Sequence, residues 1–250
     1  MTVYNATRYT SNIPEGMDPI TVLYGGWYNE TLTERYDDLP NTDPYDWNWA
    51  RYSNKLHDTI DHGALVCGDI ENMPANVTDR QQFNDTVGKM RLLLKFAKEM
   101  RPDITLGQFG CPPYPMPRYR SQAWNHRQHQ EVVLWDNLIR PMGDHCDVIF
   151  PDLYCYFVDD YFEDGESLLR RYMSSTMGSA LATGKRVIPF ISASYPNGVM
   201  DENRAAVAAE GYLSESMLAT YLSYIDELCG DVVIWDYKAN NGPWPDWLQF

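Results

Sequence analysis

Two acidic residues, Asp69 and Glu71, end a segment that begins with the apolar run from Ala64 to Val66 and is expected to form a β-strand. Residues i and i+2 project from the same face of a strand, about 6.6 Å apart along it at roughly 3.3 Å per residue. One pocket would therefore hold both carboxylates. The ionised neighbour raises the proton affinity of the other, so Glu71 can stay protonated at neutral pH and act as a general acid toward a leaving oxygen.

Glycoside cleavage is the chemistry that this pair suits. It uses either two carboxyls that flank the bond, or one acid together with an acetamido group of the substrate as internal nucleophile. On the same strand face as Glu71, Asp69 is better placed to orient a substrate group than to attack the far face of a sugar, which favours the second scheme. Asp152 and Asp236 are the candidates for a separate nucleophile or base, or for binding hydroxyls. A solvated strand end or a salt bridge is the alternative for the Asp69 and Glu71 pair.

Aromatic and polar side chains occur at the ends of nearly all the other expected strands. The chain has eight Trp and 18 Tyr, and flat aromatic rings at the mouth of a cleft are what sugar faces pack on. Core packing is the alternative for most of these rings. The candidate substrate-binding residues are Trp27, Tyr28, Gln108, Asp152, Tyr154, Tyr195, Trp235 and Asp236.

Short β-branched segments, mostly separated by segments of helical periodicity, must position these residues. The expected strands cover residues 3–9, 21–28, 64–71, 104–110, 147–156, 186–195 and 231–238. Four helices are expected. The first starts at the capping box of Thr78 and Gln81 and stops before Pro102, and the second runs from Val133 to a stop at Pro141. The third covers 168–182 and ends before Gly184, and the fourth runs from the cap Ser214 to Leu228.

This repetition of βα units predicts an α/β fold. No Gly-rich phosphate loop is present, and candidate site residues follow nearly every strand, which is how barrels build a site from many strands. We therefore expect a TIM-type (β/α) barrel, distorted and with seven strands. No repeat or linker divides the chain, so residues 1–250 are expected to form a single catalytic domain.

The net charge of −15 repels phosphates, so nucleic acid is not expected as a partner. No apolar run approaches the roughly 20 residues that span a bilayer, so no membrane partner is expected. His126 and His129 lack an acidic third ligand other than Glu131, and neither a metal nor a cofactor is expected. The five cysteines show no CxxC spacing and are interpreted mostly as buried thiols, with one or two bridges left open.

The strand-end residues resemble a known family, the hyaluronidases of the eukaryotic type, which are distorted barrels that cleave N-acetylhexosaminyl bonds. Residues 64–74 (ALVCGDIENMP) resemble their strand ending in Asp-Phe-Glu, with Ile70 in place of the aromatic residue. Residues 3–7 (VYNAT) resemble their first strand, 150–154 (FPDLY) their Pro-x-x-Tyr strand, and 232–235 (VVIW) their final Val-Ile-Trp strand.

That resemblance implies a role for four residues. Glu71 would be the proton donor, Asp69 the residue that holds the acetamido group, Tyr154 a contact to that group, and Trp235 a wall of the sugar subsite. Because hyaluronan is a polyanion and the chain is acidic, a neutral or amino-sugar polymer is at least as suitable a substrate.

The expected function is thus a glycoside hydrolase acting on polysaccharide or oligosaccharide that contains N-acetylhexosamine. A cell-wall muramidase is one alternative, because its barrel also carries an Asp-x-Glu strand. A non-catalytic glycan-binding or structural barrel is another. The oligomeric state and the compartment stay open, with secretion favoured if the chain is a glycosidase.

Overall fold

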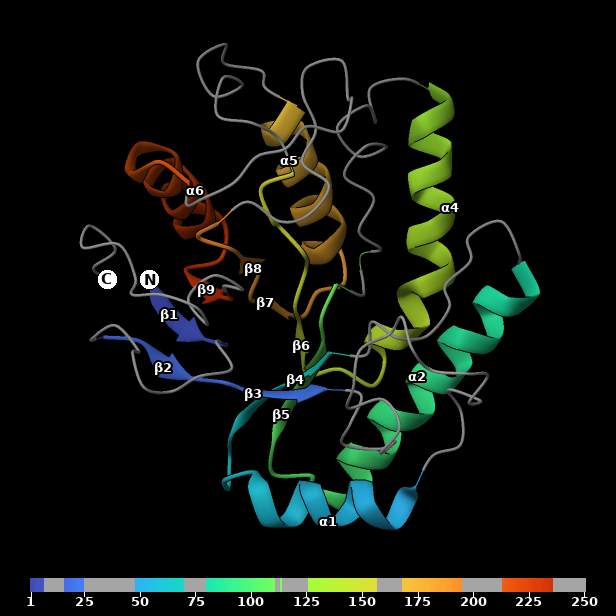
Figure 1. Ribbon diagram of the computed structural model, residues 1–250. Coiled ribbons are helices and arrows are strands. Elements are labelled where there is room, and N and C mark those ends of the chain that lie inside the picture. Colours follow the sequence, from blue (N-terminus) through green and yellow to red (C-terminus); the bar gives the residue numbers. More distant parts are fainter. Residues whose placement is uncertain are drawn as a thin grey trace, which may run out of the picture.

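The computed structural model describes residues 1–6, 16–24, 48–69, 80–110, 113, 126–156, 168–194 and 213–235. The strands are β1 (Thr2–Asn5), β2 (Asp18–Pro19), β3 (Thr21–Tyr24), β4 (Leu65–Asp69), β5 (Thr105–Gln108), β6 (Val148–Ile149), β7 (Arg186–Val187), β8 (Phe190–Ile191) and β9 (Asp231–Ile234). The helices are α1 (Trp49–Thr59), α2 (Arg80–Met100), α4 (His126–Gly143), α5 (Leu168–Leu181) and α6 (Glu215–Leu228). Figure 1 shows these helices around the outside of the strands.

All strand pairs in the described residues are parallel, and the pairs follow one another in a circle. The segment that contains β2 and β3 pairs with β1 on one side and with β4 on the other, and β4 pairs with β5. Backbone hydrogen bonds outside the regular ladders continue the order: Gly110 N donates to Phe150 O at 2.8 Å, and Leu153 N donates to Phe190 O at 2.9 Å. From β8 the order passes to β9 and returns to β1.

The predicted α/β fold of parallel strands is confirmed, but the described strands do not form one continuous closed sheet. They fall into three sheets, ordered β2-β1-β9-β8, β3-β4-β5 and β6-β7, joined by isolated bridges. Two prolines account for some of the short ladders, since a proline has no N–H to donate. Pro189 separates β7 from β8, and Pro151 follows Phe150 directly after β6. The expected strands at 147–156 and 186–195 are therefore shorter than predicted.

Two hydrophobic clusters show how the strands divide their side chains. The outer cluster places strand residues such as Val66, Leu106 and Ile234 against helix residues such as Leu93 and Ile225. The inner cluster contains only strand residues and their direct neighbours, and we define it by its fully described core: Ala6, Cys67, Val148, Phe150, Ile188, Phe190 and Val233. Because side chains alternate between the faces of a strand, one face of each strand meets the helices and the other fills the interior.

Gly107 on β5 makes room for the inner cluster. A Cβ built at this position would meet Val148 O and would lie 2.7 Å from the ring of Phe150. We expect Gly107→Ala to lower the free energy of unfolding by about 1–3 kcal/mol or more, because overpacking here pushes against backbone as well as a ring. Urea unfolding followed by circular dichroism measures it.

Gly88 on α2 is the matched control for that substitution, because a Cβ built there has no heavy atom within 4 Å. Gly88→Ala should raise stability by about 0.5–1 kcal/mol, as expected for replacing glycine inside a helix. Equal effects of the two substitutions would contradict the close packing at Gly107.

The helices differ from expectation in two places. Helix α1 was not predicted: Asn48 caps it by accepting from Arg51 N at 2.9 Å, and Tyr52 and Leu56, four residues apart, bury one face. Helix α4 begins at His126, before the expected start at Val133, and continues beyond Pro141 to Gly143, so the predicted stop at Pro141 is wrong. Proline removes one N–H and clashes with the preceding turn, but burial of Met142 against the core holds two further residues in the helix.

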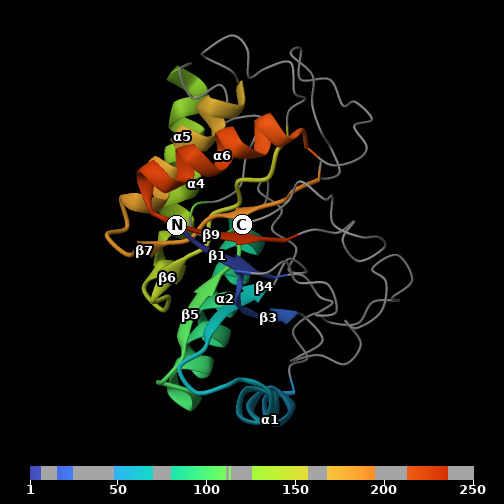
Figure 2. The same cartoon turned by 90° about the vertical axis from the view of Figure 1, so that its left-hand side faces the viewer.

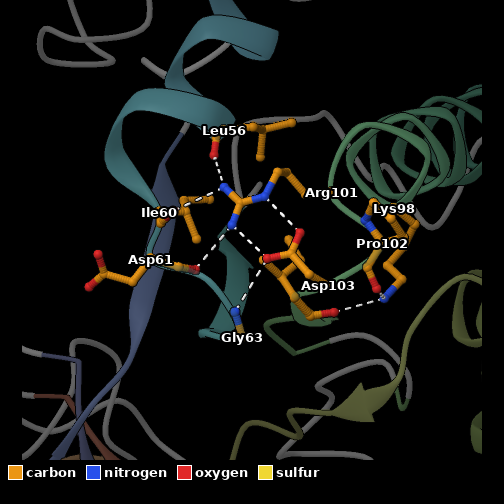
Figure 3. Close-up of polar contacts among 9 residues, drawn as sticks. Leu56, Ile60, Asp61, Gly63, Lys98, Arg101, Pro102 and Asp103 are labelled. Carbon is orange, nitrogen blue, oxygen red and sulfur yellow. Dashed lines mark hydrogen bonds and ion pairs between the residues drawn. The ribbon is translucent and has the colours of Figure 1, made fainter.

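Arg101 ties the end of α1 to the start of β5, as Figure 3 shows. Its Nη1 donates to the carbonyl oxygens of Leu56 (2.5 Å) and Ile60 (2.9 Å), and Nη2 donates to Asp61 O (3.1 Å). Nε and Nη2 bind the two carboxylate oxygens of Asp103, each at 2.8 Å. All five N–H groups of the guanidinium are thereby used, and they give donors to one carbonyl in the last turn of α1 and to the carbonyls of the two residues that follow the helix.

None of the helices in the described ranges combines the length and the apolar character that crossing a membrane requires.

Candidate active site at the carboxyl ends of the strands

Half of the predicted site residues lie in the described part of the chain. Asp69, Gln108, Asp152, Tyr154 and Trp235 are described. The others lie outside the described residues, and their roles stay predictions: Trp27, Tyr28, Glu71, Tyr195 and Asp236.

Asp69 is the last residue of β4 and is half-buried. It is paired with Tyr24 on β3, and on the other side Phe109 N donates to the oxygen of the preceding Gly68 at 2.8 Å. Cys67, two residues earlier on the strand, belongs to the inner cluster. Alternation along the strand therefore places Asp69 on the inner face, at the end of the interior that the strands' carboxyl ends form.

Tyr154 and Trp235 form a stacked ring pair at the same end of the interior. Their ring centroids are 5.8 Å apart and the planes differ by 20°. They come from the segments after β6 and at the end of β9, with β8 between them. The register places Ser192 level with both rings, and this small buried side chain leaves room for them to meet. Two predicted substrate-binding residues are thus brought together, with an aromatic face of the kind on which sugars pack.

Phe109 is an inner-face residue that the sequence prediction missed. Its ring lies 5.6 Å from that of Tyr154 and 5.0 Å from that of Phe190. It follows Gly107 by two residues, so both lie on the inner face of the β5 segment. The signal was available, because strand alternation places either Gln108 or Phe109 inward, and the larger apolar ring is the better candidate for an interior.

Gln108 is buried on the opposite face of β5 from Phe109. A Cβ built on its register partner Gly68 would lie 2.7 Å from Gln108 Oε1. Gln108 Oε1 is among the buried polar atoms for which the described residues supply no hydrogen-bond partner. The structure therefore does not bring Gln108 together with Asp69, Tyr154 and Trp235 on one face, and substrate binding by Gln108 stays a prediction.

Asp152 is 3% exposed and is hydrogen-bonded inside the protein. Oδ1 accepts from Tyr154 N at 2.8 Å, and Oδ2 accepts from Tyr156 Oη at 2.5 Å. Burial, followed by the nearby charge of Asp152, raises the pKa of the Tyr156 hydroxyl well above its usual value. The hydroxyl is therefore a protonated donor at neutral pH.

No group of three His, Cys, Asp or Glu side chains that could hold a metal ion is found within the described ranges. The four described cysteines, Cys67, Cys146, Cys155 and Cys229, are all thiols. Burial raises the pKa of Cys146 to about 12, so it is an unreactive core thiol.

Comparison with solved structures connects this geometry to known proteins. The chain is similar to bee venom hyaluronidase in complex with a hyaluronic acid tetramer, with a TM-score of 0.59 and 16% identity over 96% of this chain and 91% of the other. A second crystal structure of bee venom hyaluronidase gives a TM-score of 0.55 and 17% identity over 89% and 80%. A GH18 chitinase from Pseudoalteromonas aurantia gives 0.47 and 15% over 93% and 74%.

No protein-family model matches the sequence, and no curated protein sequence matches it significantly. The likeness is therefore one of fold, at an identity too low to transfer an activity. It spans nearly the whole of both chains. The chain has a mixed α/β fold shared with TIM-barrel glycoside hydrolases.

Proposed function

We propose that this protein is a glycoside hydrolase that cleaves glycans containing N-acetylhexosamine, with Glu71 as the acid and base and Asp69 as the residue that orients the substrate's acetamido group. One observation carries the proposal: Asp69 and the stacked pair of Tyr154 and Trp235 lie on the inner face of the strands, at their carboxyl ends. A carboxylate and an aromatic face at the same end of the interior are the kinds of groups that cleaving and binding a sugar use.

The proposed reaction needs no protein carboxylate as the nucleophile, because the acetamido group of the substrate takes that part. Glu71 gives its proton to the glycosidic oxygen as the bond to the anomeric carbon breaks, and the acetamido oxygen forms a bond to that carbon. Glu71, now a carboxylate, then takes a proton from the water that opens this cyclic intermediate. Asp69 would hold the acetamido N–H, and Tyr154 would contact the same group.

The distribution of charge supports a neutral or cationic glycan over a polyanion. Segments that continue the chain from the carboxyl ends of strands carry nineteen of the 35 acidic residues and six of the 20 basic ones. These segments are residues 7–15, 25–47, 70–79, 111–125, 157–167, 195–212 and 236–250. The rest of the chain is nearly neutral by the same count, so these segments carry most of the net negative charge of the protein, and a net negative charge repels a polyanion.

Release of reducing ends from chitin oligomers, hyaluronan, chondroitin and peptidoglycan tests the proposal. We expect turnover of chitin oligomers, and slower turnover of hyaluronan at low salt. Added salt should bring the turnover rate of hyaluronan closer to that of chitin oligomers, because screening weakens the repulsion between like charges. The Debye length falls to about 8 Å at physiological ionic strength.

The other outcomes separate the alternatives. Hyaluronan as the best substrate at low salt would contradict the charge argument but not the glycosidase. Cleavage of peptidoglycan alone would indicate a muramidase. Binding of a glycan without release of reducing ends from any substrate would contradict the proposed function and indicate a non-catalytic glycan-binding protein.

A further inference from the structure

Both the side chain and the backbone of Asp152 form hydrogen bonds within the protein. Its two carboxylate oxygens accept from Tyr154 N (2.8 Å) and Tyr156 Oη (2.5 Å), and its backbone oxygen accepts from Tyr172 Oη on α5 at 2.5 Å. An isolated parallel bridge pairs it with Phe190 on β8. The residue is therefore fixed to two neighbouring elements as well as to its own segment.

The bond from Tyr154 N to Asp152 Oδ1 closes a turn over the backbone that carries Tyr154. An aspartate that accepts from the N–H two residues later restrains the backbone between them. The turn lies in the segment that follows β6. Here the ring of Tyr154 must point inward to stack on Trp235 and to contact Phe109. The carboxylate of Asp152 supplies the restraint that the ended strand ladder no longer supplies.

Direct binding of a sugar by Asp152 would conflict with these contacts. The side chain is 3% exposed, and Tyr156 and Tyr154 each donate to a different carboxylate oxygen. A substrate hydroxyl would have to enter a buried site and compete with a donor already in place, and displacing that donor would leave a buried N–H or O–H group without its acceptor.

We propose that Asp152 is a positioning residue for the glycan site, which acts through the backbone of Tyr154 to hold the stacked pair of Tyr154 and Trp235, while Tyr156 holds the carboxylate in place. Its effect on turnover rests on the proposed function, whereas its effect on the ring pair does not. The role differs from that of a nucleophile, a base or a hydroxyl ligand, because Asp152 then touches neither the substrate nor the reacting atoms.

Three variants test this role against a direct one. Asp152→Asn keeps the acceptor for Tyr154 N, so kcat and KM should stay within about threefold of wild type. Asp152→Ala removes the acceptor and should raise KM about tenfold, which corresponds to about 1.4 kcal/mol, with a smaller change in kcat, since the displaced rings no longer offer the sugar an ordered aromatic face. Asp136→Asn is the control, because Asp136 also accepts from a hydroxyl, that of Ser179 at 2.6 Å, but lies on α4.

A loss of about 10² in kcat for Asp152→Asn, or a shift in its pH profile, would overturn the proposal in favour of direct participation of the carboxylate. Crystal structures of the variants provide the readout that needs no substrate: the ring of Tyr154 should leave Trp235 in Asp152→Ala and stay in Asp152→Asn. If Asp152→Ala does not fold, Asp152→Leu takes its place, since it removes the acceptors without leaving a cavity.

These readouts separate the two proposals. Wild-type protein that cleaves no glycan, together with a displaced Tyr154 ring in Asp152→Ala, would contradict the glycosidase and support the positioning role. A Tyr154 and Trp235 pair that is unchanged in Asp152→Ala would overturn the positioning role, whatever the activity.

Discussion

Glu71→Gln is expected to lower the rate of glycan cleavage by roughly 10² or more while leaving the affinity for the glycan nearly unchanged. Glutamine keeps the shape of the side chain but has no proton to give to the leaving oxygen. Asp69→Asn should also lower kcat, because an amide cannot hold an acetamido N–H with the strength of a charged acceptor. Reducing-end release measures the rate, and isothermal titration calorimetry with an uncleaved oligomer measures binding.

Glu99→Gln is the matched control for the Glu71 substitution. Glu99 lies on α2, its side chain is 62% exposed, and its ion pair with Lys95 at 3.7 Å is a surface pair. Its replacement should change neither rate nor affinity. A Glu71→Gln protein that keeps more than about a tenth of wild-type kcat would contradict the role of Glu71 as the general acid, because loss of general acid catalysis typically costs 10²–10⁴.

Arg101→Met is expected to lower the free energy of unfolding by about 3–5 kcal/mol, the range for breaking a buried ion pair by removing one partner. The substitution removes the Arg101 donors from three carbonyl oxygens and from the Asp103 carboxylate, all drawn in Figure 3. Arg101→Lys should recover only part of the loss, since an ammonium cannot span the same positions as the planar guanidinium. Chemical denaturation measures both, with Lys95→Gln as an exposed control.

Low pH should remove part of the stabilisation that the ion pair of Arg101 and Asp103 provides. The Arg101 guanidinium, by its hydrogen bond to Asp103, holds the pKa of that carboxyl below its usual value. The unfolded chain therefore takes up a proton near pH 4 while the folded chain does not, so the stabilisation is present above about pH 5 and is lost as the pH falls further. Asp103→Asn should accordingly weaken the protein at pH 7 and have less effect at pH 3. Equal effects at both pH values would contradict the linkage.

Neither Arg101 variant should change kcat of the folded protein. Arg101 joins the end of α1 to the segment before β5, at the amino ends of the strands. In Figure 2, α1 lies at the bottom of the view, below β4 and β5. Asp69, Tyr154 and Trp235 lie at the carboxyl ends of their strands. An unchanged kcat in both variants would thus show that Arg101 contributes to stability and not to catalysis.

The sequence by itself determined the order and type of most elements. Helix α6 begins after the Ser214 cap, whose Oγ accepts from Met217 N at 3.3 Å, and Gly230 follows its end with a φ of 73°. Such signals depend on neighbours in the chain, which is why they can be seen without a fold. Helix α1 was not predicted because its apolar face is narrow. That face becomes part of the core only through packing against α2, where the rings of Tyr52 and Phe96 lie 5.8 Å apart.

The candidate site shows the same division. The sequence placed Asp69, Tyr154 and Trp235 at strand ends, because strand periodicity and chemical type are local properties. Only the tertiary structure decided that Phe109 lies inward with Tyr154 while Gln108 faces the helices, and that Asp152 bonds to Tyr154 and Tyr156. Which face of a strand becomes the interior, and which carboxylate is buried, depends on the elements packed on either side of it, and these are distant in sequence.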